Sequence, residues 1–242
     1  MASTEGTGNP TTDSPAPGGN SRGNVVLAPG HLLGGAFQIE GVVGEGGMAV
    51  VYRAVQKSLA RPVAIKVLHG RFAADPQFIS RFEAESGALA SLTHPNIVTI
   101  FDRGSDGQHY YFVMELVDGE TLDLRIVNDT LARESWRGII TACGEALDYV
   151  HRRGVVHRDI KASNILIDRE GRVKLGDFGI AHIVGGDEGE AAQITAPRKA
   201  VGTASYMAPE QTADPSSVDS RADIYSLGVT FYKMMTRRLP VG

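Results

Sequence analysis

The chain has 242 residues, with 24 Lys or Arg, 28 Asp or Glu and a formal net charge of −4, which leaves room for one large or two small domains. Hydrophobic residues make up 42% and charged residues 21%, proportions typical of a soluble globular protein. The acidic excess disfavours a nucleic-acid-binding protein, and the single cysteine, Cys143, excludes an intrachain disulfide and a Cys-rich zinc site. No run of about 18 apolar residues and no secretory leader is found, so no membrane span is predicted and a cytoplasmic location is expected.

The first 36 residues are predicted to form a disordered tail. Residues 1–24 consist almost entirely of Gly, Pro, Ser, Thr, Asn and Ala, which cannot bury enough apolar surface to offset the entropy of ordering. After the tail, three short segments are rich in Val, Ile and Tyr and are separated by turns, a pattern that predicts an antiparallel meander. These segments are 37–43, 49–54 and 62–68.

A helix and two more strands are predicted next. The spacing of Phe78, Phe82 and Leu89 predicts a helix over residues 75–92. The strands are predicted at 96–101 and 109–115, with a turn at 104–107 between them. We therefore expect an α+β lobe at residues 37–117, with five antiparallel strands and one helix.

From residue 118 onwards the apolar pattern has a helical period. Trp136, Ile139, Cys143 and Leu147 fit one buried helical face. A hairpin is predicted at 165–173 and, after a loop-rich region, a helix at 221–235. Residues 118–242 therefore predict a second, mainly helical lobe.

The segment Gly44-Glu45-Gly46-Gly47-Met48-Ala49 has the form G-x-G-x-x-A. In a dinucleotide-binding fold such glycines open a helix, whereas here a β pattern follows directly from residue 50. The glycines are therefore predicted at a hairpin tip, where backbone N–H groups can approach phosphate oxygens closely. A flexible hairpin that binds no ligand stays an alternative for this motif alone.

Lys66 lies in the otherwise apolar segment Val63-Ala64-Ile65-Lys66. A buried ammonium is costly unless it is paired, so this lysine needs a carboxylate or a phosphate beside it. Glu85 is the best candidate partner, because it shares the helical face of Phe82 and Leu89. The alternative is that Lys66 lies on an exposed face and Glu85 is solvated.

Between two apolar runs, residues 157–164 read His-Arg-Asp-Ile-Lys-Ala-Ser-Asn, so several polar groups can face one small volume. Asp177-Phe178-Gly179 follows at the end of another apolar run. The oxygen atoms of Asn164 and Asp177, together with phosphate and water oxygens, would suit Mg²⁺. Asp159 is then left to act as a base.

Taken together, these motifs resemble those of the bacterial eukaryotic-like serine/threonine protein kinases. The sequences GEGGMA, VAIK, HRDIKASN, DFG and APE occur in the order found in that family. The resemblance covers residues 37–242 and implies a bilobal protein kinase fold, with 37–117 as the N-lobe and 118–242 as a partial C-lobe. It implies ATP and Mg²⁺ as cofactors and protein Ser or Thr hydroxyls as acceptors.

The resemblance also assigns roles to individual residues. Asp159 would accept the proton of the substrate hydroxyl, Lys161 would neutralise charge on the transferred group, and Asn164 and Asp177 would hold the metal ions. Lys66, held by Glu85, would bind the nucleotide phosphates. The nucleotide-binding residues implied by the family are Val43, Gly44, Glu45, Gly46, Gly47, Met48, Ala49, Val51, Ala64, Lys66, Glu85, Met114, Glu115, Val117, Asn164, Leu166 and Asp177. His157 and Phe178, with Leu89 and Ile100, match a structural core stack of the family.

The family also suggests how the chain is regulated and what it binds. Arg158 directly precedes the expected base, which marks kinases that are switched by phosphorylation of the activation loop. Thr195 is the hydroxyl residue between Phe178 and Thr203, and we expect its phosphate to pair with Arg158. Relatives imply a homodimer through the N-lobe, and a longer form of the protein would carry a membrane anchor downstream.

The expected helix at 221–235 is followed by few residues, so the C-lobe is expected to be incomplete. The face of Ile224, Leu227, Phe231 and Met234 would then leave apolar surface uncovered. Asp223 matches the residue of the family that holds the catalytic loop. A second reading therefore stays open, in which the chain is a truncated, non-catalytic nucleotide-binding or interaction module.

Overall fold

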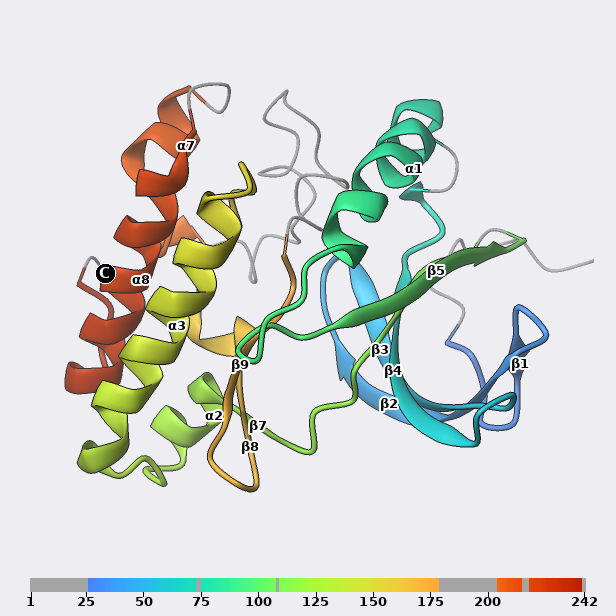
Figure 1. Cartoon of the computed structure of the whole chain (residues 1–242), viewed down its shortest axis with the longest axis horizontal. Helices are drawn as coiled ribbons and strands as arrows, with labels where there is room; N and C mark the ends of the chain where they lie inside the picture. Colours follow the sequence, from blue (N-terminus) through green and yellow to red (C-terminus); the bar gives the residue numbers. More distant parts are fainter. Residues whose placement is uncertain (1–25, 73–74, 108, 179–203, 215–217, 241–242) are drawn as a thin grey trace, which may run out of the picture.

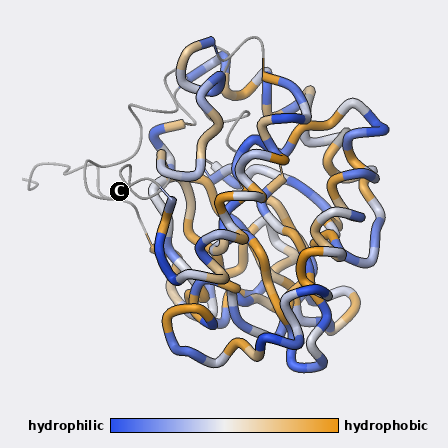
Figure 2. The backbone as a smooth tube through the Cα atoms, turned by 90° about the vertical axis from the view of Figure 1, so that its left-hand side faces the viewer, coloured by the Kyte–Doolittle hydropathy of each residue, from blue (hydrophilic) through white to orange (hydrophobic). Residues whose placement is uncertain are grey.

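The structure, a computed structural model, describes residues 26–72, 75–107, 109–178, 204–214 and 218–240, without the side chains of Glu85 and Ala88. It has two lobes that lie side by side (Figure 1). One lobe contains a curved sheet and α1, and the other contains the long helices α3 and α8. In Figure 2 the hydrophobic stretches run through the middle of the fold. None of the described helices is both long and apolar enough to cross a membrane.

The first lobe is built on a six-stranded antiparallel sheet with the order β1-β2-β3-β4-β6-β5. Its strands are β1 (Leu32–Leu33), β2 (Phe37–Glu45), β3 (Ala49–Gln56), β4 (Arg61–Leu68), β5 (Ile100–Asp106) and β6 (His109–Met114). The five predicted strands are confirmed, although β5 begins later than expected and includes residues 104–106, which were predicted as a turn. Residues 96–98 do not belong to β5, because the backbone groups of Asn96 and Val98 form hydrogen bonds with Leu175 of the second lobe.

The additional strand, β1, lies within the segment that was expected to be disordered. Leu27 and Leu33 are buried with Phe37 and Tyr52 in one apolar cluster, and the Leu27 amide donates to the Tyr52 hydroxyl at 3.1 Å. The prediction of a disordered tail is therefore wrong for residues 26–36. These leucines supply the apolar surface that the preceding residues lack, so the chain is folded before residue 37.

Helix α1 (Pro76–Ala90) packs one aromatic face against the sheet. Asp75 caps its first turn by accepting a hydrogen bond from the Gln77 amide at 2.9 Å. The rings of Phe82 and Tyr110 are 5.1 Å apart, and those of Phe82 and Phe112 are 5.0 Å apart. The predicted helix is therefore confirmed, and the spacing of its phenylalanines places them on the face that packs against β6.

The second lobe is mainly helical, as predicted, and also has a three-stranded sheet, β7-β8-β9. Its elements are β7 (Gly119–Thr121), α2 (Leu122–Val127), α3 (Trp136–His151), β8 (Ile165–Asp168), β9 (Val173–Leu175), α7 (Pro209–Ala213) and α8 (Ser220–Thr236). Short 3-10 turns occupy Arg133–Ser135 and Ala162–Asn164. The sequence predicts the β8-β9 hairpin, α3 and α8, but it gives no signal for β7 or α2.

One core runs through both lobes. Residues of α1, α3 and α8 pack together with Phe178 in a single buried cluster. On α8, Leu227 and Met234 belong to this cluster, whereas 56% of Ile224 is exposed. The expected uncovered apolar surface on this helix face is therefore found at Ile224, whereas Leu227 and Met234 pack into the core and Phe231 packs against it.

Cys143 should react with iodoacetamide only when the chain unfolds. It is fully buried in α3, and burial raises the pKa of its thiol to about 12. At pH 8 the reactive thiolate is then about one ten-thousandth of the total, against roughly a quarter for a free cysteine. Mass spectrometry after timed labelling, without and with guanidinium, measures this protection. Rapid labelling of the native chain would contradict it.

Candidate functional site

Three predicted residues meet in the loop between α3 and β8. The Asp159 carboxylate accepts a hydrogen bond from Lys161 Nζ at 2.8 Å and another from Asn164 Nδ2 at 3.0 Å. Asn164 Nδ2 also donates to the Asp159 carbonyl at 2.8 Å, because the 3-10 turn at Ala162–Asn164 folds the chain back on itself. The loop therefore holds an ammonium and an amide in direct contact with one carboxylate.

Asp223 fixes this loop from α8. Its buried carboxylate accepts hydrogen bonds from the backbone amides of His157 and Arg158, both at 2.8 Å, and from His151 Nε2 at 2.8 Å. Arg158 has a φ of 64°, a left-handed conformation that is costly for a residue with a side chain. The hydrogen bonds to Asp223 hold the backbone in this conformation, so α8 determines where Asp159 lies.

Lys66 and Asp177 form an ion pair across the two lobes. Lys66 Nζ lies 2.8 Å from Asp177 Oδ1, and the exposed fraction of Lys66 is only 8%. The alternative that places Lys66 on an exposed face is therefore wrong. Burial alone would raise the pKa of the Asp177 carboxyl, but the charge and hydrogen bond of Lys66 and, to a smaller extent, the charge of Lys161 hold it below its ordinary value. The side chain of Glu85, the predicted partner, lies outside the described residues.

His157 and Phe178 form part of the core beneath these charges. Their ring centres are 4.3 Å apart, and His157 is fully buried. His157 Nε2 donates to the Gly176 carbonyl at 2.9 Å, while its Nδ1 accepts from the Asp159 amide at 3.3 Å. Both ring nitrogens are thus bound to backbone groups next to Asp159 and Asp177, which supports a structural rather than a proton-transferring role.

The glycine-rich segment lies at the predicted hairpin tip between β2 and β3. The Gly46 amide donates to the Ala49 carbonyl at 2.9 Å. The carbonyl oxygen of Gly46 lies 3.0 Å from His69 Nε2, and that of Gly47 accepts from Arg71. The tip is therefore tied to the residues that follow β4. Sequence reasoning did not identify His69 or Arg71.

A small apolar cluster joins residues of β3, β4, β6 and β8. Ala64, Val98 and Met114 are its buried members, and Val51, Leu116, Val117 and Leu166 pack against it. The cluster brings together most of the apolar residues expected to hold a nucleotide base, whereas Val43 is 60% exposed and is not part of it. Val98 and Leu116 were missed, because nothing in their local sequence distinguishes them from other core residues.

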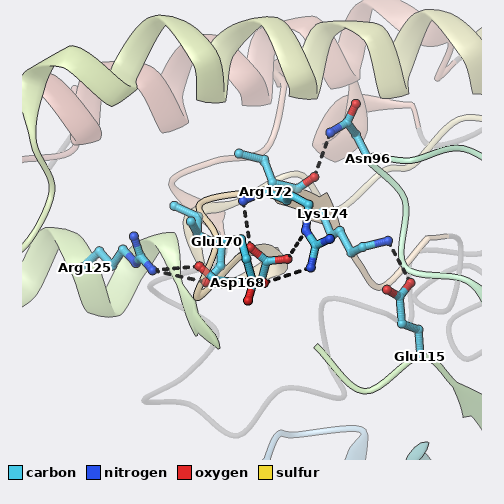
Figure 3. A network of polar contacts seen from close by, with 9 residues as sticks. Asn96, Glu115, Arg125, Asp168, Glu170, Arg172 and Lys174 are labelled. Carbon is cyan, nitrogen blue, oxygen red and sulfur yellow. Dashed lines mark hydrogen bonds and ion pairs between the residues drawn. The ribbon is translucent and has the colours of Figure 1, made fainter. Parts of the chain in front are cut away.

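Figure 3 shows a polar network around β9 that was not predicted. Glu115, just after β6, accepts from Lys174 Nζ at 2.8 Å and from the Thr99 amide at 3.3 Å. Asn96 Nδ2 donates to the Val173 carbonyl at 2.9 Å. The network joins the connection between the lobes to β9, and Lys174 is only three positions before Asp177 in the sequence.

Comparison with known proteins agrees with this geometry. The family model described as "Protein kinase domain" matches residues 37–242. The chain belongs to the protein kinase family.

Curated kinases from several bacteria are similar to the chain. It is 41% identical over 222 residues to the probable serine/threonine-protein kinase PknB of Bifidobacterium longum, covering 88% of this chain and 32% of that protein. It is 40% identical over 210 residues to PknL of Mycobacterium tuberculosis, covering 86% of this chain and 51% of that protein. The kinase chain therefore spans a third to a half of these relatives.

Solved kinase structures have the same fold. The PknI kinase domain of M. tuberculosis superposes with a TM-score of 0.72 at 30% identity, covering 90% of this chain and 78% of that one. A structure of Rad53 residues 1–466, solved in complex with AMP-PNP, matches with a TM-score of 0.66 at 29% identity, covering 86% of this chain and 50% of that one. Both lobes of the kinase fold are thus represented in the chain.

Within this kinase domain, Lys174→Met should lower the free energy of unfolding by about 1–2 kcal/mol. The substitution leaves Glu115 partly buried without its cation, since the exposed fractions of the two side chains are 14% and 28%. Arg152→Met is the matched control, because Arg152 pairs with Asp148 where both side chains are mostly exposed, and about 0.5 kcal/mol or less is expected. Urea melts measure both changes, and equal losses would contradict the prediction.

Proposed function

We propose that the chain is the catalytic domain of an ATP-dependent protein serine/threonine kinase. The observation that carries the proposal is the cluster of Asp159, Lys161 and Asn164 beside the ion pair of Lys66 and Asp177. Lys161 links the two groups, because its charge contributes to lowering the pKa of Asp177. The curated relatives named serine/threonine-protein kinases support the same activity.

In this reaction Asp159 accepts a hydrogen bond from the hydroxyl of a Ser or Thr side chain in the protein substrate. The hydroxyl oxygen forms a bond to the γ-phosphorus while the bond from that phosphorus to the bridging oxygen of ADP breaks, and Asp159 takes the proton. Lys161, already 2.8 Å from Asp159, can offset the negative charge of the transferred group. Most of the rate enhancement then comes from positioning and charge.

The ATP site would lie between the glycine tip and the apolar cluster of Ala64, Val98 and Met114. The apolar side chains suit a purine ring. If Lys66 left Asp177 to bind a phosphate, the negative charge of the phosphate would still balance the charge of the lysine. Since the Glu115 amide donates to the Thr99 carbonyl at 2.9 Å, the carbonyl is the backbone group of Glu115 left to face the base.

Asn164 and Asp177 fit a divalent cation, and we propose Mg²⁺. The amide nitrogen of Asn164 is bonded to Asp159, so its oxygen is the atom that can bind a metal. Together with the Asp177 carboxylate this gives a set of oxygen ligands, which Mg²⁺ prefers. The ion would neutralise charge on the phosphates when bound.

We also propose how the chain is regulated and which partners it has. A phosphate on Thr195 would pair with Arg158, although Thr195 lies outside the described residues. Full transfer activity of Thr195→Ala after phosphatase treatment would overturn this. The sequence resemblance suggests an N-lobe homodimer, which can be tested by sedimentation, and the sequence lacks a long apolar run, which suggests a cytoplasmic location.

Mg-ATP at about 100 times its Kd should raise the free energy of unfolding by about 2.7 kcal/mol, because only the folded chain binds it. Thermal melts with Mg-ATP, compared between the wild type and Lys66→Met, measure this. Lys57→Met is a matched control at an exposed turn. Stabilisation with transfer of labelled phosphate to a Ser/Thr peptide supports the kinase. Stabilisation without transfer would support the non-catalytic module instead.

A further inference from the structure

Arg103, on the edge strand β5, reaches the middle of α1. Its Nη1 donates to the carbonyl oxygens of Phe82 and Glu83, both at 3.0 Å, and also to the Ser86 hydroxyl. The guanidinium carbon lies 5.8 Å from the centre of the Phe82 ring. One side chain thus contacts a full turn of α1 through three acceptors.

These bonds are not needed to satisfy the backbone of α1. Carbonyl groups in the middle of a helix already accept from the amide four residues later, so a guanidinium there serves to connect two elements. The Ser86 hydroxyl, which is fully buried, also donates to the Phe82 carbonyl. The planar guanidinium suits such neighbouring acceptors better than a flexible ammonium does.

Arg103 lies beside an open groove between α1 and β5. The groove has a volume of about 340 Å³ and is lined by Phe82, Glu83, Arg103, Gly104, Ser105 and Tyr110. At this groove the rings of Phe82 and Tyr110 pack with their centres 5.1 Å apart. Arg103 adds a polar connection between α1 and β5 to this aromatic contact.

The position of α1 matters for the proposed active site. Phe82 and Leu89 of α1 belong to the same buried cluster as Phe178, which directly follows Asp177. If α1 moved away from the sheet, Phe178 would lose part of its cover and Asp177 would no longer be held within 2.8 Å of Lys66.

We propose that Arg103 is a positioning residue for phosphoryl transfer. By tying α1 to β5, it keeps Phe178 covered and Asp177 in place, although it touches no reacting atom. The inference rests on the proposed kinase function for its effect on the rate. The connection between α1 and β5 through Arg103, called the tie below, is a property of the fold and can be measured without activity.

Hydrogen exchange tests the tie directly. Arg103→Ala should speed the exchange of amides in residues 76–90 by about fivefold or more, while α3 stays unchanged. The matched control is Arg53→Ala, because Arg53 pairs with Glu40 at 2.8 Å on the exposed side of β3 and does not reach α1. Unchanged exchange in α1 of Arg103→Ala would overturn the proposal.

Kinetics test the effect on catalysis. Arg103→Ala should lower kcat by about 5- to 30-fold and change the KM for a peptide by less than about twofold. Arg103→Lys should recover part of kcat, and Ser86→Ala combined with Arg103→Ala should cost little more than Arg103→Ala alone. A kcat that stays equal or rises, with faster exchange in α1, would overturn the positioning role. An inactive wild type would count against the proposed function, and exchange would still decide the tie.

Discussion

Asp159→Asn is expected to reduce phosphoryl transfer by roughly 10²- to 10⁴-fold while leaving Mg-ATP binding almost unchanged. The substitution keeps the size of the side chain but removes the group that takes the hydroxyl proton. It also removes the charge that pairs with Lys161 at 2.8 Å, so the lysine is less well placed for the transferred group. Single-turnover transfer of labelled phosphate to a peptide measures the loss, and calorimetric titration with Mg-ATP measures binding.

A suitable control for this experiment is Asp148→Asn on α3. Asp148 pairs with Arg152 on the surface, and its side chain is 59% exposed. Its loss should leave both kcat and binding within about twofold of the wild type. If Asp159→Asn kept more than a tenth of the wild-type rate, Asp159 would not be the base and the proposed chemistry would need another proton acceptor.

The second large effect is expected for Asp223→Ala. It leaves the buried amide of His157 and the partly buried amide of Arg158 without their acceptor and opens a void in the core. Since a buried unsatisfied group costs about 1–3 kcal/mol, a total loss of about 2–5 kcal/mol is expected. Activity should fall as well, because the left-handed backbone at Arg158 is no longer held. Urea melts monitored by fluorescence give the change in stability.

Asp219→Ala, on the same helix, separates this effect from a general weakening of α8. Asp219 accepts a hydrogen bond from the Arg221 amide at 2.9 Å and caps the helix at an exposed position. Loss of such a cap costs about 1 kcal/mol and should not change the catalytic loop. Equal losses of stability and activity in the two variants would contradict the role of Asp223.

Much of the fold could be predicted from local patterns. The segments rich in Val, Ile and Tyr predict β2, β3 and β4, and the helical spacing of apolar residues predicts α1, α3 and α8. β1, β7 and α2 were missed because they are too short to show a period. The boundary of the tail was wrong because two leucines were enough to fold the chain before Phe37.

The candidate catalytic residues could also be predicted from the sequence. The residues that hold them in place could not. Asp159, Lys161 and Asn164 lie close together in the chain, so a loop with apolar flanks already brings them into one volume. The contacts of Glu115 with Lys174 and of Arg103 with α1 join segments that are distant in sequence. No local pattern marks such partners, and the ion pair of Lys66 with Asp177 depends on how the two lobes meet.

The catalytic loop depends on an acceptor that follows it by 65 residues, Asp223 on α8. During synthesis on the ribosome the loop is made before α8. The amides of His157 and Arg158 therefore lack their acceptor, Asp223, until α8 has been synthesised. A nascent chain that ends before α8 would therefore contain every motif of the loop without the acceptor that holds its backbone.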